Sequence, residues 1–73
     1  MTISYDPEAD ALSIIFRDTT VTTEHLAEGI AAEYDADGNL AGIEILDASL
    51  RLGGRESLNT VIAEGMAPAV VAA

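Results

Sequence analysis

Three groups of carboxylate side chains have the residue types and spacing to bind a metal ion or to act as acid–base pairs. They are Asp6, Glu8 and Asp10; Asp35 and Asp37 with Asn39; and Glu44 with Asp47. A turn with this much negative charge could hold a hydrated divalent cation weakly. Glycosidase chemistry needs two carboxyl groups about 5 to 9.5 Å apart in a cleft, and a chain this short offers little cleft for a sugar.

The second group resembles the opening of a calcium-binding loop, but its spacing is wrong. An EF-hand loop has glycine at position six and a bidentate glutamate at position twelve. Counted from Asp35, these positions are Leu40 and Leu46. The run Asp35–Asn39 therefore predicts a turn rather than a calcium site.

His25 is the only imidazole in the chain. Glu24 and Glu28 are near it in sequence, and Ser13 or Ser49 could serve as a nucleophile if the fold brought one of them to it. No Gly-x-Ser-x-Gly motif is present, and a histidine metal site usually needs at least two histidines. We therefore expect His25 to be a surface or edge-strand residue.

The overall expectation is a protein with no catalytic residue, no metal and no cofactor. Lysine is absent, which excludes Schiff-base and P-loop chemistry, and Gly53-Gly54 lacks the spacing of a phosphate-binding loop. The alternative is a small metal-binding protein or hydrolase that uses the Asp6–Asp10 turn or His25.

The charge of the chain bears directly on its partners. Thirteen acidic side chains stand against three basic ones, for a net charge of −10. Nucleic acids and anionic membrane surfaces repel such a chain, because binding to them depends on lysine and arginine. We therefore predict no nucleic-acid partner and no membrane partner. The N-terminus has neither the basic nor the apolar region of a signal peptide, so we expect a cytoplasmic protein.

The 73 residues include few large apolar side chains with which to build a core. Thirteen of the apolar residues are alanine, which leaves 23 larger ones, and no cysteine can staple the chain. With roughly 1.5 kcal/mol of ordering entropy per residue, so small a core gives a stability near zero. We therefore expect a homo-oligomer, either a dimer or a larger assembly.

The first part of the chain has the period-two pattern of β-strands separated by turn residues. Asp6–Asp10 and Asp35–Asn39 are the two clearest turns, and in the second Gly38 can take the positive φ of a G1 bulge. The strands predicted around these turns cover residues 2–5, 11–17, 21–25, 30–35 and 40–47.

The pattern changes after the last predicted strand. Residues 55–63 have the i, i+3, i+4 apolar spacing of a helix. Residues 47–52 form either a short helical turn capped by Asp47 or the start of a linker. An Ala-rich tail follows Pro68.

These elements predict an α+β fold. It consists of an antiparallel β-meander of four to five strands with a C-terminal helix packed on one face. Residues 1–52 form the meander, and residues 53–73 form the helix and tail of the same domain.

Two segments, Tyr5–Leu12 and Tyr34–Ser49, together indicate a family. Each begins with Tyr-Asp and runs into a turn, and an acidic segment, Glu24–Gly29, lies between them. Over roughly residues 2–52 the chain resembles the DUF2283 family, a small acidic bacterial domain of unknown function. The Tyr-Asp motifs also have a structural explanation, because each ends a strand with an inward tyrosine and starts a turn whose aspartate accepts turn amides.

The resemblance implies a short, acidic, mostly β domain without an established activity, and no functional residue carries over from it. Some members of the family are encoded beside small basic proteins that resemble RNA-cleaving toxins. The resemblance therefore implies an antitoxin-like role toward a basic partner, as a family-level association.

The candidate functional residues are surface residues of a non-enzymatic interaction module. We expect an acidic face to dock a basic protein, and apolar side chains opposite the main core to form the interface between copies. The acidic candidates are Glu24, Glu28, Glu33 and Glu44, and the apolar candidates are Ile15, Leu40 and Leu46. The crowded carboxylates also repel one another, so modest salt or acidification toward pH 5 is predicted to raise thermal stability.

Overall fold

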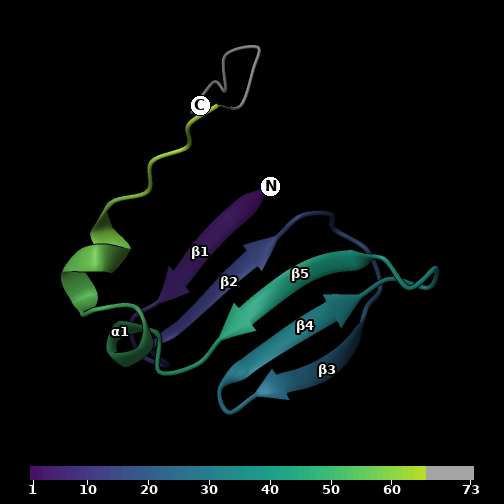
Figure 1. The fold of residues 1–73 in the computed structure, drawn as a ribbon, viewed down its shortest axis with the longest axis horizontal. Helices are drawn as coiled ribbons and strands as arrows, with labels where there is room; N and C mark the ends of the chain where they lie inside the picture. The colour runs from purple at the N-terminus through teal and green to yellow at the C-terminus, as the bar shows by residue number, and fades with distance from the viewer. Residues whose placement is uncertain (66–73) are drawn as a thin grey trace.

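The computed structural model describes residues 1–65, which form a five-stranded sheet followed by short helical segments (Figure 1). The strands are β1 (Thr2–Asp6), β2 (Ala11–Ile15), β3 (Thr22–Ala27), β4 (Ile30–Tyr34) and β5 (Leu40–Ile45). A single helical turn, α1 (Ala48–Arg51), and a 3₁₀ helix, η1 (Arg55–Asn59), follow them. The Ala-rich tail that was expected after Pro68 lies outside the described residues.

The strand order is β1-β2-β5-β4-β3, and every neighbouring pair is antiparallel. The predicted meander is therefore wrong at one point, because β2 pairs with β5 and residues 16–21 carry the chain to the far edge of the sheet (Figure 1). The physical reason lies in the composition of β3. Four of its six residues, Thr22–His25, are polar, and all six are exposed, which suits an edge strand. The more apolar β2 and β5 gain more free energy from central positions.

The turn chemistry read from the sequence is confirmed at both expected hairpins. Asp6 Oδ1 accepts a hydrogen bond from the Glu8 N–H (3.0 Å). Asp35 Oδ1 accepts one from Asp37 N–H and one from Asn39 N–H, both at 2.9 Å. Gly38 has a φ of +83°, the conformation that the bulged turn requires of it.

The helix predicted over residues 55–63 is wrong in both length and type. The segment forms the 3₁₀ helix η1 and becomes extended at Thr60, with φ −131° and ψ +123°. Two local features explain this. Gly54 at the N-cap supplies no side-chain hydrogen bond, and the β-branched run Thr60-Val61-Ile62 has stiff side chains that disfavour a helix. The fold is therefore mainly β, with only a loosely packed helical segment.

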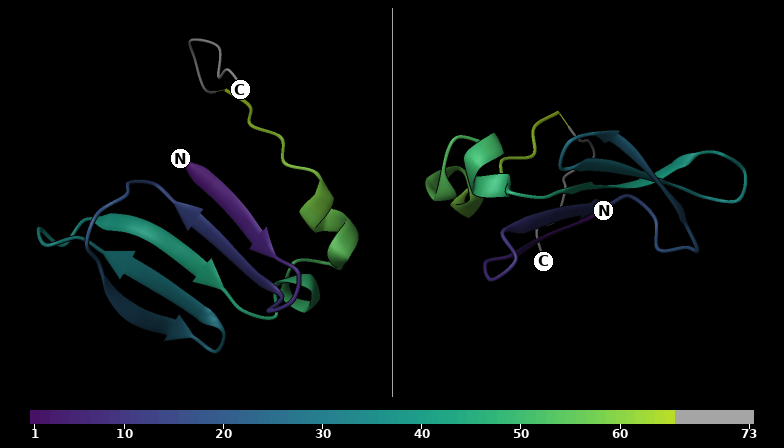
Figure 2. Two further views of the ribbon diagram at one scale, coloured as in Figure 1. Left: turned by 180° about the vertical axis from the view of Figure 1, so that it is seen from behind. Right: turned by 90° about the horizontal axis from the view of Figure 1, so that it is seen from below.

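The described residues form a thin molecule, with extents of 34 × 34 × 19 Å. Seen edge-on in Figure 2, the sheet is a single layer with α1 and η1 gathered at one end. The buried apolar residues among residues 1–65 are Ala31, Ala32, Ala41 and Ala48. No apolar side chain larger than alanine is buried in this part of the chain, so the sheet keeps its large apolar side chains at or near the surface.

Candidate functional site

Strand register divides the sheet into an apolar side and a polar side, because residues paired across antiparallel strands point to the same side. Two adjacent rows on one side are Ile3, Ile14, Ile43 and Ala32, and Tyr5, Leu12, Ile45 and Ile30. These eight residues are called the apolar sheet face. All of them except Ala32 are half-buried or exposed.

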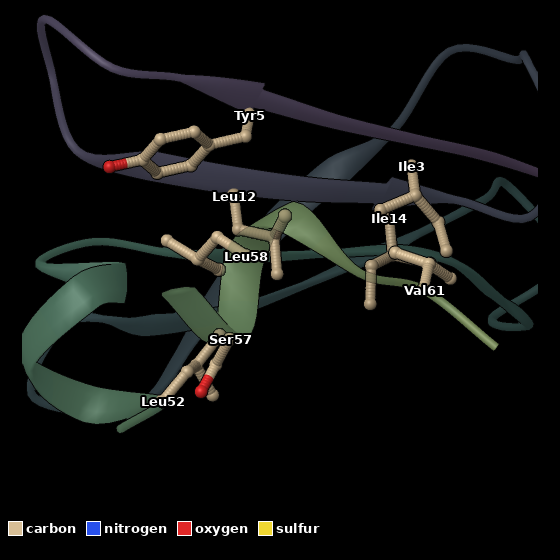
Figure 3. Close-up of a pocket in the computed structure, with 8 residues that line it drawn as sticks. All are labelled: Ile3, Tyr5, Leu12, Ile14, Leu52, Ser57, Leu58 and Val61. Carbon is tan, nitrogen blue, oxygen red and sulfur yellow. The ribbon is translucent and has the colours of Figure 1, made fainter. Parts of the chain in front are cut away.

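A groove of about 350 Å³ separates the β1–β2 end of the apolar sheet face from the C-terminal arm, defined as residues 55–65 (Figure 3). Four of its lining residues come from the sheet, and four come from the segment that follows α1. They are Ile3, Tyr5, Leu12 and Ile14, and Leu52, Ser57, Leu58 and Val61. The arm therefore lies over one end of the apolar sheet face without filling the space beneath it.

The opposite side, called the polar sheet face, carries hydroxyl and carboxylate side chains. Its rows are Ser4, Ser13, Glu44, Ala31 and His25, and Thr2, Ile15, Gly42, Glu33 and Thr23. The Glu33 side chain lies over Gly42, because a Cβ built on Gly42 would be 2.8 Å from Glu33 Oε1. Two carboxylates from neighbouring strands thus share this face.

The four glutamates expected to form one acidic face are divided by the register. Glu33 and Glu44 lie on the polar sheet face. Glu24 pairs with Ala32, so it lies at the β3 edge on the same side as the apolar sheet face, and Glu28 lies in the β3–β4 turn.

The three apolar candidates lie at different places around β5. Ile15 pairs with Gly42 on the polar sheet face, close to the start of β5, where Leu40 lies. Leu46 follows the other end of the strand, and its N–H donates to the Gly29 carbonyl (2.8 Å). All three are exposed, but the length of β5 separates Leu46 from the other two.

His25 shares a row with a serine and a glutamate, but three strands separate the ends of that row. Ser13 pairs with Glu44, Glu44 with Ala31, and Ala31 with His25. At about 4.8 Å per strand, His25 is two strands, or roughly 10 Å, from Glu44. Proton transfer needs roughly 2.6–3.2 Å between heavy atoms, so this row does not form a catalytic triad.

Asp10 joins the β1–β2 turn to the start of α1. Its carboxylate accepts hydrogen bonds from the Ser49 N–H (3.0 Å), the Ser49 hydroxyl (2.7 Å) and the Tyr5 hydroxyl (2.5 Å). Its carbonyl accepts one from the Ala48 N–H (2.9 Å). The first N–H groups of a helix have no acceptor within the helix, and here Asp10 accepts hydrogen bonds from two of them. Tyr5, Asp10 and Ser49 are called the Asp10 cluster.

The helical turn over residues 48–51 agrees with one of the two sequence alternatives, but its expected cap is wrong. Asp47 occupies the N-cap position with a left-handed backbone (φ +51°) and makes no side-chain cap hydrogen bond. Asp10, whose backbone is also left-handed (φ +51°), accepts the cap hydrogen bond instead, and it does so from the β1–β2 turn. Only the tertiary fold brings the two segments together.

The same hydrogen bonds set the ionisation of the Asp10 cluster. Donation from the hydroxyls of Tyr5 and Ser49 lowers the pKa of the Asp10 carboxyl below its usual value. Donating its proton to Asp10 raises the pKa of the Tyr5 hydroxyl, because the hydrogen bond favours the protonated phenol. The carboxylates of Asp6 and Asp10 are thus engaged in turn and helix contacts. Among residues 1–65 no three His, Asp or Glu side chains are placed to hold a metal ion.

A family model described as a protein of unknown function, DUF2283, matches residues 2–49. The chain belongs to the DUF2283 family. The matched span runs from β1 to Ser49, so it contains both partners of the Asp10–Ser49 contact and ends before the C-terminal arm. No curated protein and no solved structure matches the chain.

A second carboxylate in this DUF2283 domain organises the β4–β5 turn. The Arg17 guanidinium forms an ion pair with Asp35, whose side chain is only 7% exposed while that of Arg17 is 54% exposed. Hydrogen bonding to Arg17, and then to the Asn39 N–H, lowers the pKa of the Asp35 carboxyl. Arg17 follows β2, so this ion pair also joins residues 16–21, which connect β2 to β3, to the β4–β5 turn.

Sequence reasoning identified the turn aspartates of this DUF2283 domain but missed the roles of Asp10 and Ser49. A signal was present, since Asp10 belongs to the first motif segment and Ser49 ends the second. Nothing in the spacing shows that the two segments touch, because 39 positions separate them. The exposure of the apolar sheet face was missed because its residues were assigned to a covered core. Among residues 1–65 no helix has the length and hydropathy to cross a membrane.

Proposed function

We propose that this DUF2283 domain is a non-enzymatic interaction module that self-associates through the apolar sheet face. One observation carries the proposal: no apolar side chain larger than alanine is buried among residues 1–65. Burial of apolar surface stabilises by about 25 cal/mol per Å². A sheet that leaves seven large side chains of one face in contact with water gains much of that free energy only when a second surface covers them.

The size and charge of the apolar sheet face favour a second copy as that surface. A standard interface buries about 800 Å² per partner, which a sheet face within extents of 34 × 34 Å can supply. Two chains of net charge −10 repel one another, so they must meet where charge is low. Of the residues paired on this side of the sheet, Glu24 at the β3 edge is the charged one.

Sedimentation equilibrium at micromolar concentration tests the proposal directly. We expect a mass above the 7.6 kDa of a single chain, and a clean monomer would overturn it. A pair of matched variants then locates the interface. Ile3→Ser changes the apolar sheet face at a side chain that is 41% exposed, and Ile15→Ser changes the polar sheet face at one that is 37% exposed.

The two variants distinguish the apolar sheet face from the surface expected from the sequence. In a symmetric dimer each substitution occurs twice, so Ile3→Ser should weaken association on the order of ten- to a hundred-fold, while Ile15→Ser leaves it near wild type. The reverse order would assign the interface to the side of Ile15. Circular dichroism of both variants checks that each remains folded.

A second function follows from the charge on the opposite side. Glu33 and Glu44 lie on the polar sheet face, so they remain accessible when the apolar sheet faces meet. A basic protein, as in the antitoxin-like association of the family, is the partner that this charge favours. Co-expression with the adjacent gene product, followed by pull-down at low salt, tests this. Glu33→Gln with Glu44→Gln should reduce capture, whereas the matched pair Glu56→Gln and Glu64→Gln on the arm should not.

A further inference from the structure

The C-terminal arm covers the apolar sheet face incompletely within one chain. A groove of about 350 Å³ remains between Ile3 and Ile14 on the sheet and Leu58 and Val61 on the arm (Figure 3). Val61 is still 64% exposed and Ile62 is 73% exposed. The groove is open to solvent and most of its lining is apolar, so a segment that filled it would bury further apolar surface and gain free energy.

The arm is joined to the sheet through a glycine hinge. Gly53 and Gly54 have φ values of +86° and +101°, in the left-handed region that glycine enters at little cost. The hydrogen bonds beside the hinge, from Gly54 N–H to the Ser49 carbonyl and from Ser57 N–H to the Gly54 carbonyl, stay within residues 49–57. Within the described part of the chain no hydrogen bond ties the arm to a strand, so the hinge can redirect it without breaking the sheet.

The arm is also the part of one copy that can approach another most easily. Residues 57–63 carry no charged side chain, in a protein whose net charge is −10. The groove is apolar on its sheet side, where Ile3, Leu12 and Ile14 lie. Insertion of this segment from a second copy therefore brings no further like charge into the groove.

We propose that two copies exchange their C-terminal arms, so that Val61 of one copy packs over Ile3 and Ile14 of the other. The inference rests on the proposed self-association and specifies its partner segment. Exchange recreates the contacts that the arm makes within one chain, which is why domain swapping is a low-cost route to a dimer. It also places the exposed Val61 and Ile62 between the two copies, where a second surface can cover them.

The absence of native cysteine allows a direct test in the full chain. The double variant Ile3→Cys with Val61→Cys places two thiols on opposite sides of the groove, and Ile15→Cys with Val61→Cys is the control on the polar sheet face. Each protein is oxidised at the micromolar concentration used for sedimentation and separated on a non-reducing gel. We expect the first variant to migrate mainly at twice the mass of one chain, and the control to form much less of that species.

Each outcome separates the exchange from the self-association on which it rests. Wild-type protein that sediments as a dimer, with a disulfide that forms within single chains, would overturn the exchange and leave the proposed function standing. A wild-type monomer would remove both. If the cysteine variants do not fold, a mixed sample of ¹³C-labelled and unlabelled wild-type chains gives the same information. Nuclear Overhauser contacts from the Val61 methyls of one copy to the Ile14 methyls of the other would support exchange, and contacts only within one copy would overturn it.

Discussion

The Asp10 carboxylate holds both the N–H and the hydroxyl of Ser49, at 3.0 and 2.7 Å, across a separation of 39 residues. This contact joins the first hairpin to the helical turn that follows the last strand. Because α1 leads directly to the glycine hinge, the same contact fixes the point from which the C-terminal arm leaves the sheet. A carboxylate that sequence analysis placed in a possible metal-binding turn is therefore a structural residue.

Asp10→Asn should lower the melting temperature markedly. Asparagine keeps the shape of the side chain and tolerates the left-handed backbone at φ +51°, but its amide nitrogen would face the hydroxyl donors of Tyr5 or Ser49. We expect a fall on the order of 5 °C or more by circular dichroism. Asp18→Asn, at an exposed residue, removes the same charge and should change the melting temperature little. Equal effects of the two substitutions would show that charge, not the Asp10 cluster, sets the result.

The stability of the protein should depend on pH in two opposite ways. Asp10 and Asp35 have folded pKa values below the usual value of about 3.9, so they stabilise the fold above that pH and lose this contribution as the pH falls through their folded values. Between pH 7 and pH 5 both remain ionised, and partial relief of carboxylate repulsion should raise the melting temperature modestly. Thermal melts at pH 7, 5, 4 and 3 should therefore show a rise and then a fall below pH 4. A continuous rise to pH 3 would contradict the roles of both aspartates.

The β4–β5 turn should depend on one of its two aspartates and not on the other. Asp35 accepts hydrogen bonds from the amides of Asp37 and Asn39 and pairs with Arg17, whereas the Asp37 carboxylate accepts none among residues 1–65. Asp35→Asn should lower the melting temperature by several times as much as Asp37→Asn. Raising the salt concentration should reduce the difference only in part, since the turn hydrogen bonds are local. Equal losses would mean that the turn does not need the Asp35 side chain.

Gly42 and Gly38 should both resist substitution, for different reasons. In Gly42→Ala the new Cβ would lie 2.8 Å from Glu33 Oε1 and 3.0 Å from the Ile14 carbonyl, so overpacking should cost about 1–3 kcal/mol. In Gly38→Ala nothing lies within 4 Å, but a φ of +83° should cost about 1 kcal/mol through backbone strain. Urea denaturation measures both values. In a Glu33→Ala background the cost of Gly42→Ala should fall while that of Gly38→Ala does not, and an unchanged cost at Gly42 would place its strain on the Ile14 carbonyl alone.

The local structure of this DUF2283 domain could be predicted wherever short-range chemistry decides it. The Asp6 and Asp35 turns and the role of Gly38 follow from turn residues that lie next to one another in the chain. The strand predicted over residues 21–25 from its β-branched side chains is observed at residues 22–27. The helix at residues 55–63 could not be predicted in the same way. Its apolar spacing fits a helix, but Gly54 and the β-branched run at 60–62 oppose one, and no strong contact with the sheet decides in its favour.

The sequence by itself determined the alternation of strands and turns, the charge of −10 and the shortage of large apolar side chains, because each depends on residue type or on neighbours in the chain. Only the tertiary structure decided that β2 pairs with β5, that Asp10 caps α1 and that Glu24 lies across the sheet from Glu33 and Glu44. All three are contacts between residues that are far apart in the chain. In the strands, a one-residue change of register would also move each side chain to the other face. The small number of large apolar side chains was thus visible from composition. That many of them remain uncovered together on the apolar sheet face could be seen only from the strand order.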